Sequence, residues 1–510
     1  MLLHRPRIPF ARHPPLNQLT PALIHLPSAT WQGCLQVTVM LGLICLCLCL
    51  ELNQPILENY VGRQIPTAMV ARNLVRGSGF FYPRIDTKPT PNYFLVEPPI
   101  FAQCTAWVHQ STRLSLGASG RLVSALASTL AGWGIYRLTR SREGPDVALL
   151  SLLAFALFPI NLRYGRACQP EMLMLGLMIA GMALLDRPRS KRAVGMGACL
   201  LSAGLAVKLT GAYLLIPLGL VILADRPRLR WFLPFLFIPA LLWYLHAWSL
   251  LATGSRASSD NGVLWLNSLI PTALFQVTTL GNFARYLLIR GFTPLGFVLA
   301  IWGLARADRL YVVWGVAALA MLVGLAAKAH HEYYWVALAP VVAVGVGRAL
   351  VDLGHWRTGG AMLAIVAFIA LACVQSRSTW VTPPQWAASG EAVAMIHRYV
   401  PAGKPLVASE ALIFLTDRQG YRLEIGQKAQ ERAASEWGQQ PIQAEDPIAL
   451  VEFYQDQGAE YFADLTEPTD PRRTALQHSI RRRFTILFDD SGVLIARLDR
   501  SREPSHASRD

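Results

Sequence analysis

Charged residues are scarce in this sequence. Asp, Glu, Lys and Arg make up 15% of the 510 residues, and hydrophobic residues make up 53%. Soluble domains carry about 25% charged residues on average. The shortage of charge argues against a wholly soluble protein and favours a membrane protein, and the length leaves room for one soluble domain as well.

Acidic residues are scarcer than basic ones, 32 against 47, which gives the chain a formal net charge of +15. A basic excess is common in nucleic-acid-binding proteins, but here many basic residues form short clusters between apolar segments. These clusters lie at 137–142, 187–192, 226–230 and 306–309. Such clusters are typical of the cytoplasmic loops of membrane proteins. We therefore expect the lipid bilayer, and no nucleic acid, as a partner.

The sequence has neither a disulfide framework nor the cysteine spacing of a zinc site. Nearly all of its eight cysteines lie inside apolar segments, where cysteine behaves as a small hydrophobic residue. Cys45, Cys47 and Cys49 alternate within one such segment, which is not a metal-binding spacing. No cysteine follows Cys373, so disulfides do not hold the last part of the chain together. We predict no metal site, and the sequence leaves a divalent-metal requirement open.

The apolar segments predict a polytopic α-helical membrane protein with about eleven transmembrane helices. The first follows a basic, proline-rich stretch and no small-residue cleavage site comes after it, so we predict an uncleaved signal anchor with a cytoplasmic amino terminus. Residues 98–110 are too short to span and are predicted to form an interfacial or re-entrant helix. Every strong basic cluster then lies in the cytoplasm. The predicted spans are 33–50, 119–137, 145–161, 170–185, 193–207, 211–224, 231–250, 290–304, 310–327, 334–350 and 360–375.

The chain is predicted to divide into a disordered tail at 1–32, a membrane domain at 33–375, a soluble extracytoplasmic α/β domain at 376–500 and a second disordered tail at 501–510. The soluble part alternates helical and extended patterns and has no glycine-rich phosphate loop, so a nucleotide site there has little support. Its predicted helices are 390–400, 446–457 and 474–482, and its predicted strands are 404–409, 459–465, 483–488 and 492–498.

The outer loop, residues 51–98, is the longest polar interval in the first two-thirds of the chain and far longer than a usual connector. It carries the acids Glu58, Asp86 and Glu97, and Glu97 directly precedes two prolines that stiffen the entry to an apolar helix. An ionisable residue at a membrane boundary is costly and is by default a functional hypothesis. Such a carboxylate could bind a cation, accept a proton or orient a sugar hydroxyl; a solvated loop end is the alternative.

The predicted topology collects other polar segments on the same side as the outer loop. They are 163–171, Lys208, a long loop at 251–289, 328–334 and the soluble domain. Convergence of this kind is expected of a catalytic or binding cavity, although a solvated outer surface also produces some of it. Arginines in the outer loop and in these segments, such as Arg84 in the loop, suit phosphate oxygens, and others would only meet lipid headgroups.

A histidine pair, His330 and His331, suggests a metal at first sight. Adjacent side chains of a helix or strand point in different directions, and no further ligand is spaced to complete a site. We instead expect His331 to form hydrogen bonds at the mouth of a cavity, with Tyr334 at the membrane interface.

A series of motifs carries a resemblance to a known family. The outer loop contains RQxPTAMVARNL, GxGFxYPRID and VEPPI, GRLVSAL opens the next helix, and YGRACQPEMLML, AVKLTGAYLLIP and HHEYYW follow. In this order they resemble bacterial membrane glycosyltransferases of the GT-C superfamily, glycosyltransferase family 39, which is related to protein O-mannosyltransferases and the lipid A aminoarabinose transferase. The resemblance covers residues 33–350, and the soluble tail is similar to the outer domain of many members.

The resemblance implies an inverting hexosyl- or pentosyltransferase in the bacterial inner membrane. Its donor would be a sugar on a polyprenyl phosphate, its acceptor a lipid, glycan or protein at the outer face, and no further cofactor is implied. By motif position, Glu97 corresponds to the acid of the family's Glu-Pro-Pro entry. The other matched positions are Arg63 and Gln64 in the loop, and Arg166, Glu171, Lys208 and His331 in the later cavity motifs.

The loop departs from the family pattern at one place. Many relatives carry an acid, often Asp-Glu, where this chain has Arg63 and Gln64. The catalytic base therefore stays open between Glu58, Asp86 and Glu97, because each could take the proton of the acceptor hydroxyl.

Two other classes of function compete with the glycosyltransferase. A secondary transporter or flippase of a lipid-linked or anionic substrate would also gather charge inside a membrane protein, but transporters tend to have two similar halves, and no internal repeat is evident. A non-catalytic envelope scaffold would leave the outer charges without a role.

Overall fold

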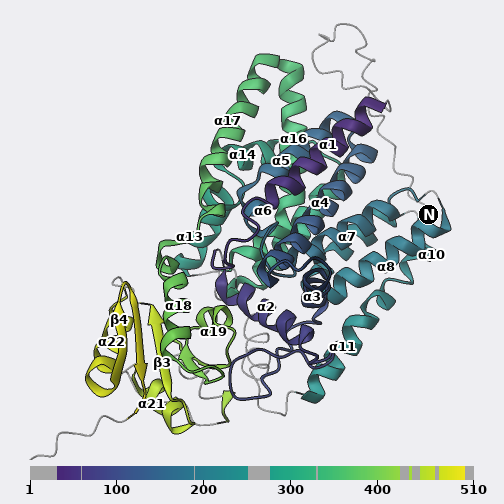
Figure 1. Ribbon diagram of the computed structural model, residues 1–510. Coiled ribbons are helices and arrows are strands. Elements are labelled where there is room, and N and C mark those ends of the chain that lie inside the picture. Colours follow the sequence, from purple (N-terminus) through teal and green to yellow (C-terminus); the bar gives the residue numbers. More distant parts are fainter. Residues whose placement is uncertain are drawn as a thin grey trace, which may run out of the picture.

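The structure is a computed structural model in which a large helical body carries a small α/β domain at one end (Figure 1). The described residues are 31–58, 60–188, 190–224, 226–250, 276–328, 331–425, 436–438, 448–465 and 470–499. The predicted tail at 501–510, nearly all of the tail at 1–32, and His330 lie outside them.

Most helices of the body follow the predicted apolar segments. The first group is α1 (Trp31–Leu48), α2 (Val61–Val75), α3 (Ile100–Thr112), α4 (Leu116–Arg142), α5 (Pro145–Leu157), α6 (Pro159–Tyr164), α7 (Glu171–Leu185) and α8 (Lys191–Val207). Short segments η1 (Leu209–Leu214), α9 (Leu215–Pro217), η2 (Leu218–Ile222), α10 (Pro227–Arg230) and η3 (Pro234–Phe237) lead to α11 (Ile238–Leu250). The rest is α13 (Val277–Arg285), η6 (Tyr286–Gly291), α14 (Pro294–Leu304), α15 (Arg309–Gly324), η7 (Ala326–Lys328), η8 (Glu332–Leu338), α16 (Ala339–Trp356) and α17 (Thr358–Ser376).

Helices α4 and α7 pack closely at the centre of the body because small residues line their contact. A Cβ atom added at Gly176 of α7 would collide with the carbonyl group of Ala127 on α4. Membrane helices use small residues in this way to bring their backbones together. The tight pair matters for the site, since α7 begins at Glu171 and α4 carries the buried Arg121.

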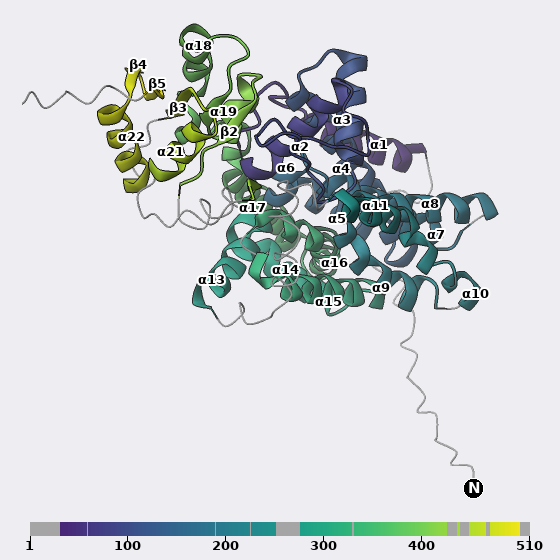
Figure 2. The same ribbon diagram turned by 90° about the horizontal axis from the view of Figure 1, so that it is seen from below.

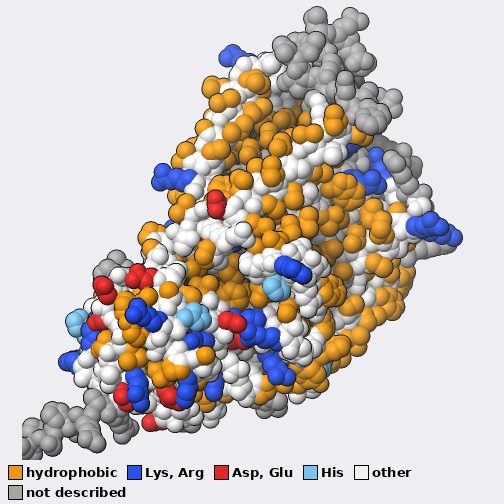
Figure 3. Space-filling view, in the orientation of Figure 1, with side chains coloured by type: hydrophobic (Ala, Val, Ile, Leu, Met, Phe, Trp, Pro, Cys, Tyr) orange, Lys and Arg blue, Asp and Glu red, His pale blue; other side chains and the backbone are white. Residues whose placement is uncertain are grey.

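The outer surface of the body is apolar. Leu46 on α1, Leu242 on α11 and Leu363 on α17 are each more than 60% exposed. Figure 3 shows hydrophobic side chains over the helical body on this face, while charged side chains gather on the α/β domain. Exposed apolar patches of this extent mark a surface that lipid covers.

The number of spans stays a prediction. Two helical stretches, Glu332–Trp356 and Thr358–Tyr399, are long and apolar enough to cross a membrane, or three if a bent pair counts as one span. Six further apolar helices of the described chain are shorter than 18 residues. Most of the predicted span at 290–304 is α14, and a bend of 98° at its start separates α14 from α13 and η6.

Two loops contain helices that the sequence analysis missed. Within the outer loop, α2 runs from Val61 to Val75 although Pro66 lies inside it. Pro66 removes one N–H donor from the second turn, since helical hydrogen bonding has already begun at Gln64, whose amide donates to the Tyr60 carbonyl, and the helix continues past it. The predicted loop at 251–289 is likewise helical from Val277, and its part at 251–275 lies outside the described residues.

The α/β domain holds a five-stranded sheet in the order β2-β1-β3-β5-β4. Its elements are α18 (Ser389–Tyr399), β1 (Leu406–Ala408), α19 (Glu410–Leu415), β2 (Gly420–Arg422), α21 (Ile448–Asp456), β3 (Tyr461–Leu465), α22 (Pro471–Arg483), β4 (Thr485–Asp490) and β5 (Val493–Arg497). Strand β1 pairs in parallel with β2 and β3, while β5 pairs antiparallel with β3 and β4. The predicted helices, strands and final hairpin are confirmed; α19 and β2 were missed.

The outer loop joins this sheet at its β2 edge. The amide of Lys88 donates to the Gly420 carbonyl at 2.8 Å, and the Gly420 amide donates to the Asp86 carbonyl at 3.0 Å. Ile65 and Met69 of α2 belong to the same hydrophobic cluster as Leu412 of α19. In Figure 2 the α/β domain, α2 and α3 accordingly share one side of the molecule, and α14 and α15 lie on the other.

Candidate functional site

A buried ion pair links the two ends of the outer loop. Glu97, just before α3, binds Arg63 in the first turn of α2, and the two side chains are only 10% and 8% exposed. Burial disfavours the charge of Arg63, but the carboxylates of Glu97 and Glu171 outweigh this and raise its pKa above the ordinary value. The Arg63 guanidinium also lies over the ring of Phe94, 5.5 Å from its centroid.

A second buried pair lies beside the first. Lys208, where α8 ends in an extended residue, binds Glu171 at the start of α7. Its Nζ atom is 4.9 Å from the ring centre of Tyr333 and 5.3 Å from that of Tyr334. The acid partner and the two rings hold the ammonium group in a place that water barely reaches. Four of the predicted site residues are thus brought together: Arg63, Glu97, Glu171 and Lys208.

The His331 ring completes an aromatic wall at this cluster. It stacks on Tyr333 with ring centroids 5.5 Å apart and packs on Tyr60 at 4.6 Å. The next residue, Glu332, accepts hydrogen bonds from Arg163 Nε at 2.8 Å and from Arg290 Nε at 2.6 Å. The aromatic wall therefore joins the outer loop to residues 331–334.

Two buried polar atoms of the cluster lack a hydrogen-bond partner among the described residues. Arg63 Nε and Glu171 Oε2 are buried and form no hydrogen bond with any described residue. Buried polar atoms in folded proteins are nearly always paired, so each exception calls for an explanation. A polar ligand that enters the cluster would supply the missing partners.

Glu58 lies apart from this cluster in a different buried ion pair. It accepts from Arg121 at 2.6 Å, and the same guanidinium donates to the carbonyls of Leu52 and Pro55 at 3.0 Å each. Gln64 donates to the Glu58 carbonyl at 2.6 Å and accepts from the Cys168 amide at 2.8 Å. These contacts fix the start of the loop against α4 and the segment before α7.

Asp86 serves the junction with the α/β domain. Its carboxylate accepts from Arg72 at 2.6 Å and from Asn73 at 3.1 Å, both on α2. Arg84, two residues earlier, is exposed and lies over the ring of Tyr93. The structure therefore separates Asp86 and Arg84 from the Glu97 cluster.

Arg166 forms its hydrogen bonds mainly with main-chain carbonyl groups, and it forms no ion pair with an acid among the described residues. Its guanidinium donates to the carbonyls of Leu50, Glu51 and Thr379 at 2.7 to 2.9 Å and to the Gln54 side chain at 3.2 Å. Burial and the nearby charge of Arg121 lower the pKa of Arg166 to about 10. With most of its donors in use, Arg166 joins the end of α1 to the chain beyond α17.

Sequence reasoning missed Arg121 and Arg290 as partners of buried acids. Arg121 could have been recognised from the sequence, because it lies inside a predicted span, where a charged side chain must find a partner. Arg290 and Glu332 are 42 residues apart and the sequence gives no sign of their pairing.

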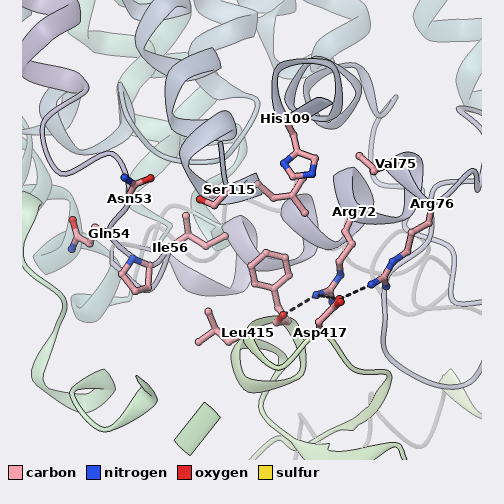
Figure 4. Close-up of a pocket in the computed structure, with 14 residues that line it drawn as sticks. Asn53, Gln54, Ile56, Arg72, Val75, Arg76, His109, Ser115, Leu415 and Asp417 are labelled. Carbon is pink, nitrogen blue, oxygen red and sulfur yellow. Dashed lines mark hydrogen bonds and ion pairs between the residues drawn. The ribbon is translucent and has the colours of Figure 1, made fainter. Parts of the chain in front are cut away.

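Two hollows lie near these residues, one beside Glu97 and one beside α2. A small one of about 20 Å³ lies against Glu97, Pro98 and Thr67 and has room for about one water-sized group. A larger one of about 510 Å³ lies between α2, the start of α4 and α19. In Figure 4, Arg72 and Arg76 point toward Asp417 at its floor. No group of three metal-binding side chains occurs within the described parts of the chain.

Comparisons with known proteins agree with the geometry. The family model for dolichyl-phosphate-mannose-protein mannosyltransferase matches residues 97–250. ArnT from Cupriavidus metallidurans has a similar structure, with TM-score 0.62, 14% identity, and coverage of 90% of this chain and 97% of that chain. The same protein bound to undecaprenyl phosphate gives TM-score 0.60 at 13% identity, with the same coverage.

Two further solved structures share the fold. The archaeal oligosaccharyltransferase AglB from Archaeoglobus fulgidus, in complex with an inhibitory peptide and a dolichol-phosphate, gives TM-score 0.52 at 13% identity, over 93% of this chain and 75% of that chain. Arabinofuranosyltransferase AftD from Mycobacteria gives 0.53 at 14%, over 92% and 40%. No curated protein matches in sequence. The family model and the shared fold both agree with the resemblance that the motifs carry: the matched model is that of a mannosyltransferase, and the fold is similar to those of ArnT, AglB and AftD.

Proposed function

We propose that the protein transfers a sugar from a polyprenyl-phosphate donor to a lipid, glycan or protein acceptor at the outer face of the bacterial inner membrane. The observation that carries the proposal is the buried charged cluster of Arg63, Glu97, Glu171 and Lys208, in which donor and acceptor atoms are left unpaired. Similar folds hold undecaprenyl phosphate in ArnT and a dolichol-phosphate in AglB, which supports a lipid-linked donor here.

Glu97 is our choice for the catalytic base. Glu58 is bound by an arginine that also fixes main-chain carbonyls, and Asp86 is enclosed by α2 at the domain junction. Glu97 lines a small hollow with room for about one hydroxyl-sized group, whereas neither Glu58 nor Asp86 lines the larger hollow beside α2. Its carboxylate takes the hydroxyl proton as the oxygen attacks the sugar from the side opposite the phosphate, and this single displacement inverts the anomeric carbon.

Cations in the cluster offset the charge that grows on the departing phosphate. Arg63 keeps a free Nε donor beside Glu97, and Lys208 lies within the same cluster. A fixed positive charge in a water-poor site stabilises a developing anion more than it would in water. Glu97 and Glu171 hold these cations in place until the donor arrives.

The proposed orientation has the amino terminus in the cytoplasm and the α/β domain outside. Arg121 and the basic cluster at 137–142 lie toward opposite ends of α4, sixteen residues or roughly 24 Å apart at 1.5 Å per residue. That distance approaches the hydrocarbon thickness of a bilayer, about 30 Å. The acids of the outer loop and the basic cluster then face opposite sides of the membrane, as the positive-inside rule requires.

The test is turnover by the purified full-length protein. It is incubated with a panel of polyprenyl-phosphate sugars and candidate acceptors, and release of polyprenyl phosphate is measured. Release that depends on acceptor supports the proposal. No release with any donor, together with movement of the lipid-linked sugar across proteoliposomes, would support the transporter instead.

A further inference from the structure

A second hollow lies at the far end of α4 from the Glu97 cluster. It has a volume of about 580 Å³ and lies where the last turns of α4 meet the end of α7. Its lining is formed by Trp133, Tyr136, Arg137, Arg140, Ser141, Ala183, Asp186 and Arg187. Because roughly a bilayer's hydrocarbon thickness of helix separates it from Arg121, this hollow lies at the opposite membrane interface.

The charge in this hollow is not balanced. Arg137, Arg140 and Arg187 form no ion pair with any residue that the structure describes. The carboxylate in the lining, Asp186, is taken by Arg142 at 2.6 Å and by the Ser141 hydroxyl. Three guanidinium groups therefore share one recess in which no carboxylate of the described residues is left for them.

One of these arginines is already held in place. Arg137 donates through Nε to the Ala183 carbonyl at 3.2 Å and lies over the ring of Trp133, 5.8 Å from its centroid. The hydrogen bond occupies one edge of the guanidinium, and the terminal nitrogens stay available. Arginine binds phosphate oxygens through two such nitrogens at once.

The ring residues suit the same ligand. Trp133 and Tyr136 are half-buried in the lining. Amphipathic rings are enriched at the depth of lipid headgroups, where one end of the ring is dry and the other wet. A bound phospholipid would place its phosphate among the arginines, and its glycerol and upper acyl carbons against the rings.

We propose that this hollow binds the phosphate of an anionic phospholipid from the surrounding leaflet. Basic recesses between membrane helices on the cytoplasmic side are known to receive such headgroups. The site takes no part in the sugar-transfer chemistry. A bound lipid would link the last turns of α4 and α7, and the first turns of the same two helices carry Arg121 and Glu171. Binding would thereby steady the helix pair that supports the charged cluster.

The test measures how much phosphatidylglycerol the full-length protein retains in a nonionic detergent, by native mass spectrometry across a lipid titration. The pocket variant is Arg137→Gln/Arg140→Gln/Arg187→Gln. The matched control is Arg306→Gln/Arg309→Gln/Arg357→Gln, which removes the same charge from exposed positions outside the hollow. We expect the pocket variant to bind phosphatidylglycerol about fivefold more weakly for each arginine removed, and the control to bind like the parent.

A loss of equal size in both triple variants would overturn the proposal, because it would reflect net charge alone. Displacement of the lipid by an excess of inorganic phosphate would also overturn it, since the site would then take the free ion. If the triple variant fails to fold, Arg140→Gln/Arg187→Gln keeps the Arg137 hydrogen bond and serves in its place. Retention of the lipid by this folded double variant at the parent's affinity would equally refute the site.

Discussion

At the scale of single residues, the three acids of the outer loop differ in what surrounds them. Glu58 and Glu97 are both paired with a buried arginine whose Nε atom has no partner among the described residues, but Arg121 also holds carbonyl groups of the main chain, whereas the Arg63 guanidinium donates to Glu97. Removing Arg121 or Glu58 would disturb the fold of the loop start. Glu97 and Arg63 lie where a ligand can complete their hydrogen bonds, which suits a chemical role.

We expect Glu97→Gln to lower turnover by about a hundredfold or more, because general-base catalysis contributes a factor of this order. The amide still accepts a hydrogen bond from Arg63, so the thermal unfolding temperature should change little. The measurement is the rate of polyprenyl phosphate release, with unfolding followed in the same detergent. Glu391→Gln on the exposed face of α18 is the control and should act like the parent. Near-normal turnover of Glu97→Gln would return the role to Glu58 or Asp86.

Lys208 and Glu171 form a buried ion pair, and its contribution to stability can be measured separately from its contribution to sugar transfer. Lys208→Met leaves the Glu171 carboxylate buried without its partner, which costs about 3–5 kcal/mol of stability. The double variant Lys208→Met/Glu171→Gln removes both charges and should recover most of that stability. We expect its sugar transfer to stay low, since the cation near the departing phosphate is gone. Thermal unfolding and the release assay check the two parts, and full activity of the double variant would contradict the phosphate role of Lys208.

At the scale of elements, α2 connects the membrane body to the α/β domain. One turn places Arg63 in the charged cluster, and the last turns place Arg72 against Asp86 and against the Phe414 carbonyl of α19 at 2.8 Å. Because a helix is stiff over such a length, a shift of the α/β domain would be transmitted to the cluster. The sequence analysis missed this helix because it lies within a long polar interval and contains Pro66, although more than half of its residues are hydrophobic.

Arg72→Gln should loosen the junction. It leaves Asp86 buried with weaker partners, so we expect a stability loss of about 3 kcal/mol and faster proteolysis between the outer loop and the α/β domain. Arg76→Gln is the matched control, because Arg76 is half-exposed and such a surface pair contributes about 1 kcal/mol or less. Limited proteolysis and thermal unfolding give the comparison. Equal effects of the two variants would show that Arg72 is not the main tie.

At the scale of the whole molecule, the polar face and the basic face lie at opposite ends of an apolar body. The outer loop and the α/β domain share a hydrophobic cluster, so they form one folded unit over the charged site. The basic residues that end α4 lie away from it. This polarity follows from the cost of moving charge through lipid, which sorts polar segments to the two surfaces.

The proposed orientation can be checked with single cysteines. Glu391→Cys on α18 should react with a membrane-impermeant maleimide added to intact spheroplasts, above the level of the parent chain. Arg309→Cys at the start of α15 should react only after the membrane is permeabilised, because it belongs to a basic cluster that stays in the cytoplasm. The opposite pattern would reverse the orientation.

The sequence by itself determined the apolar helices, the elements of the α/β domain and the GT-C motifs, because hydrophobic periodicity and turn residues are local properties. Only the tertiary structure decided which charged residues meet. Glu97 and Arg63 are 34 residues apart, and Lys208 and Glu171 are 37 apart. Pairs at such separations depend on how α2, α7 and α8 pack, and nothing in the local sequence encodes that. The sequence singled out Glu97 by the two prolines that follow it and by its motif, and left the base open between it, Glu58 and Asp86. Packing then gives each acid a different buried arginine.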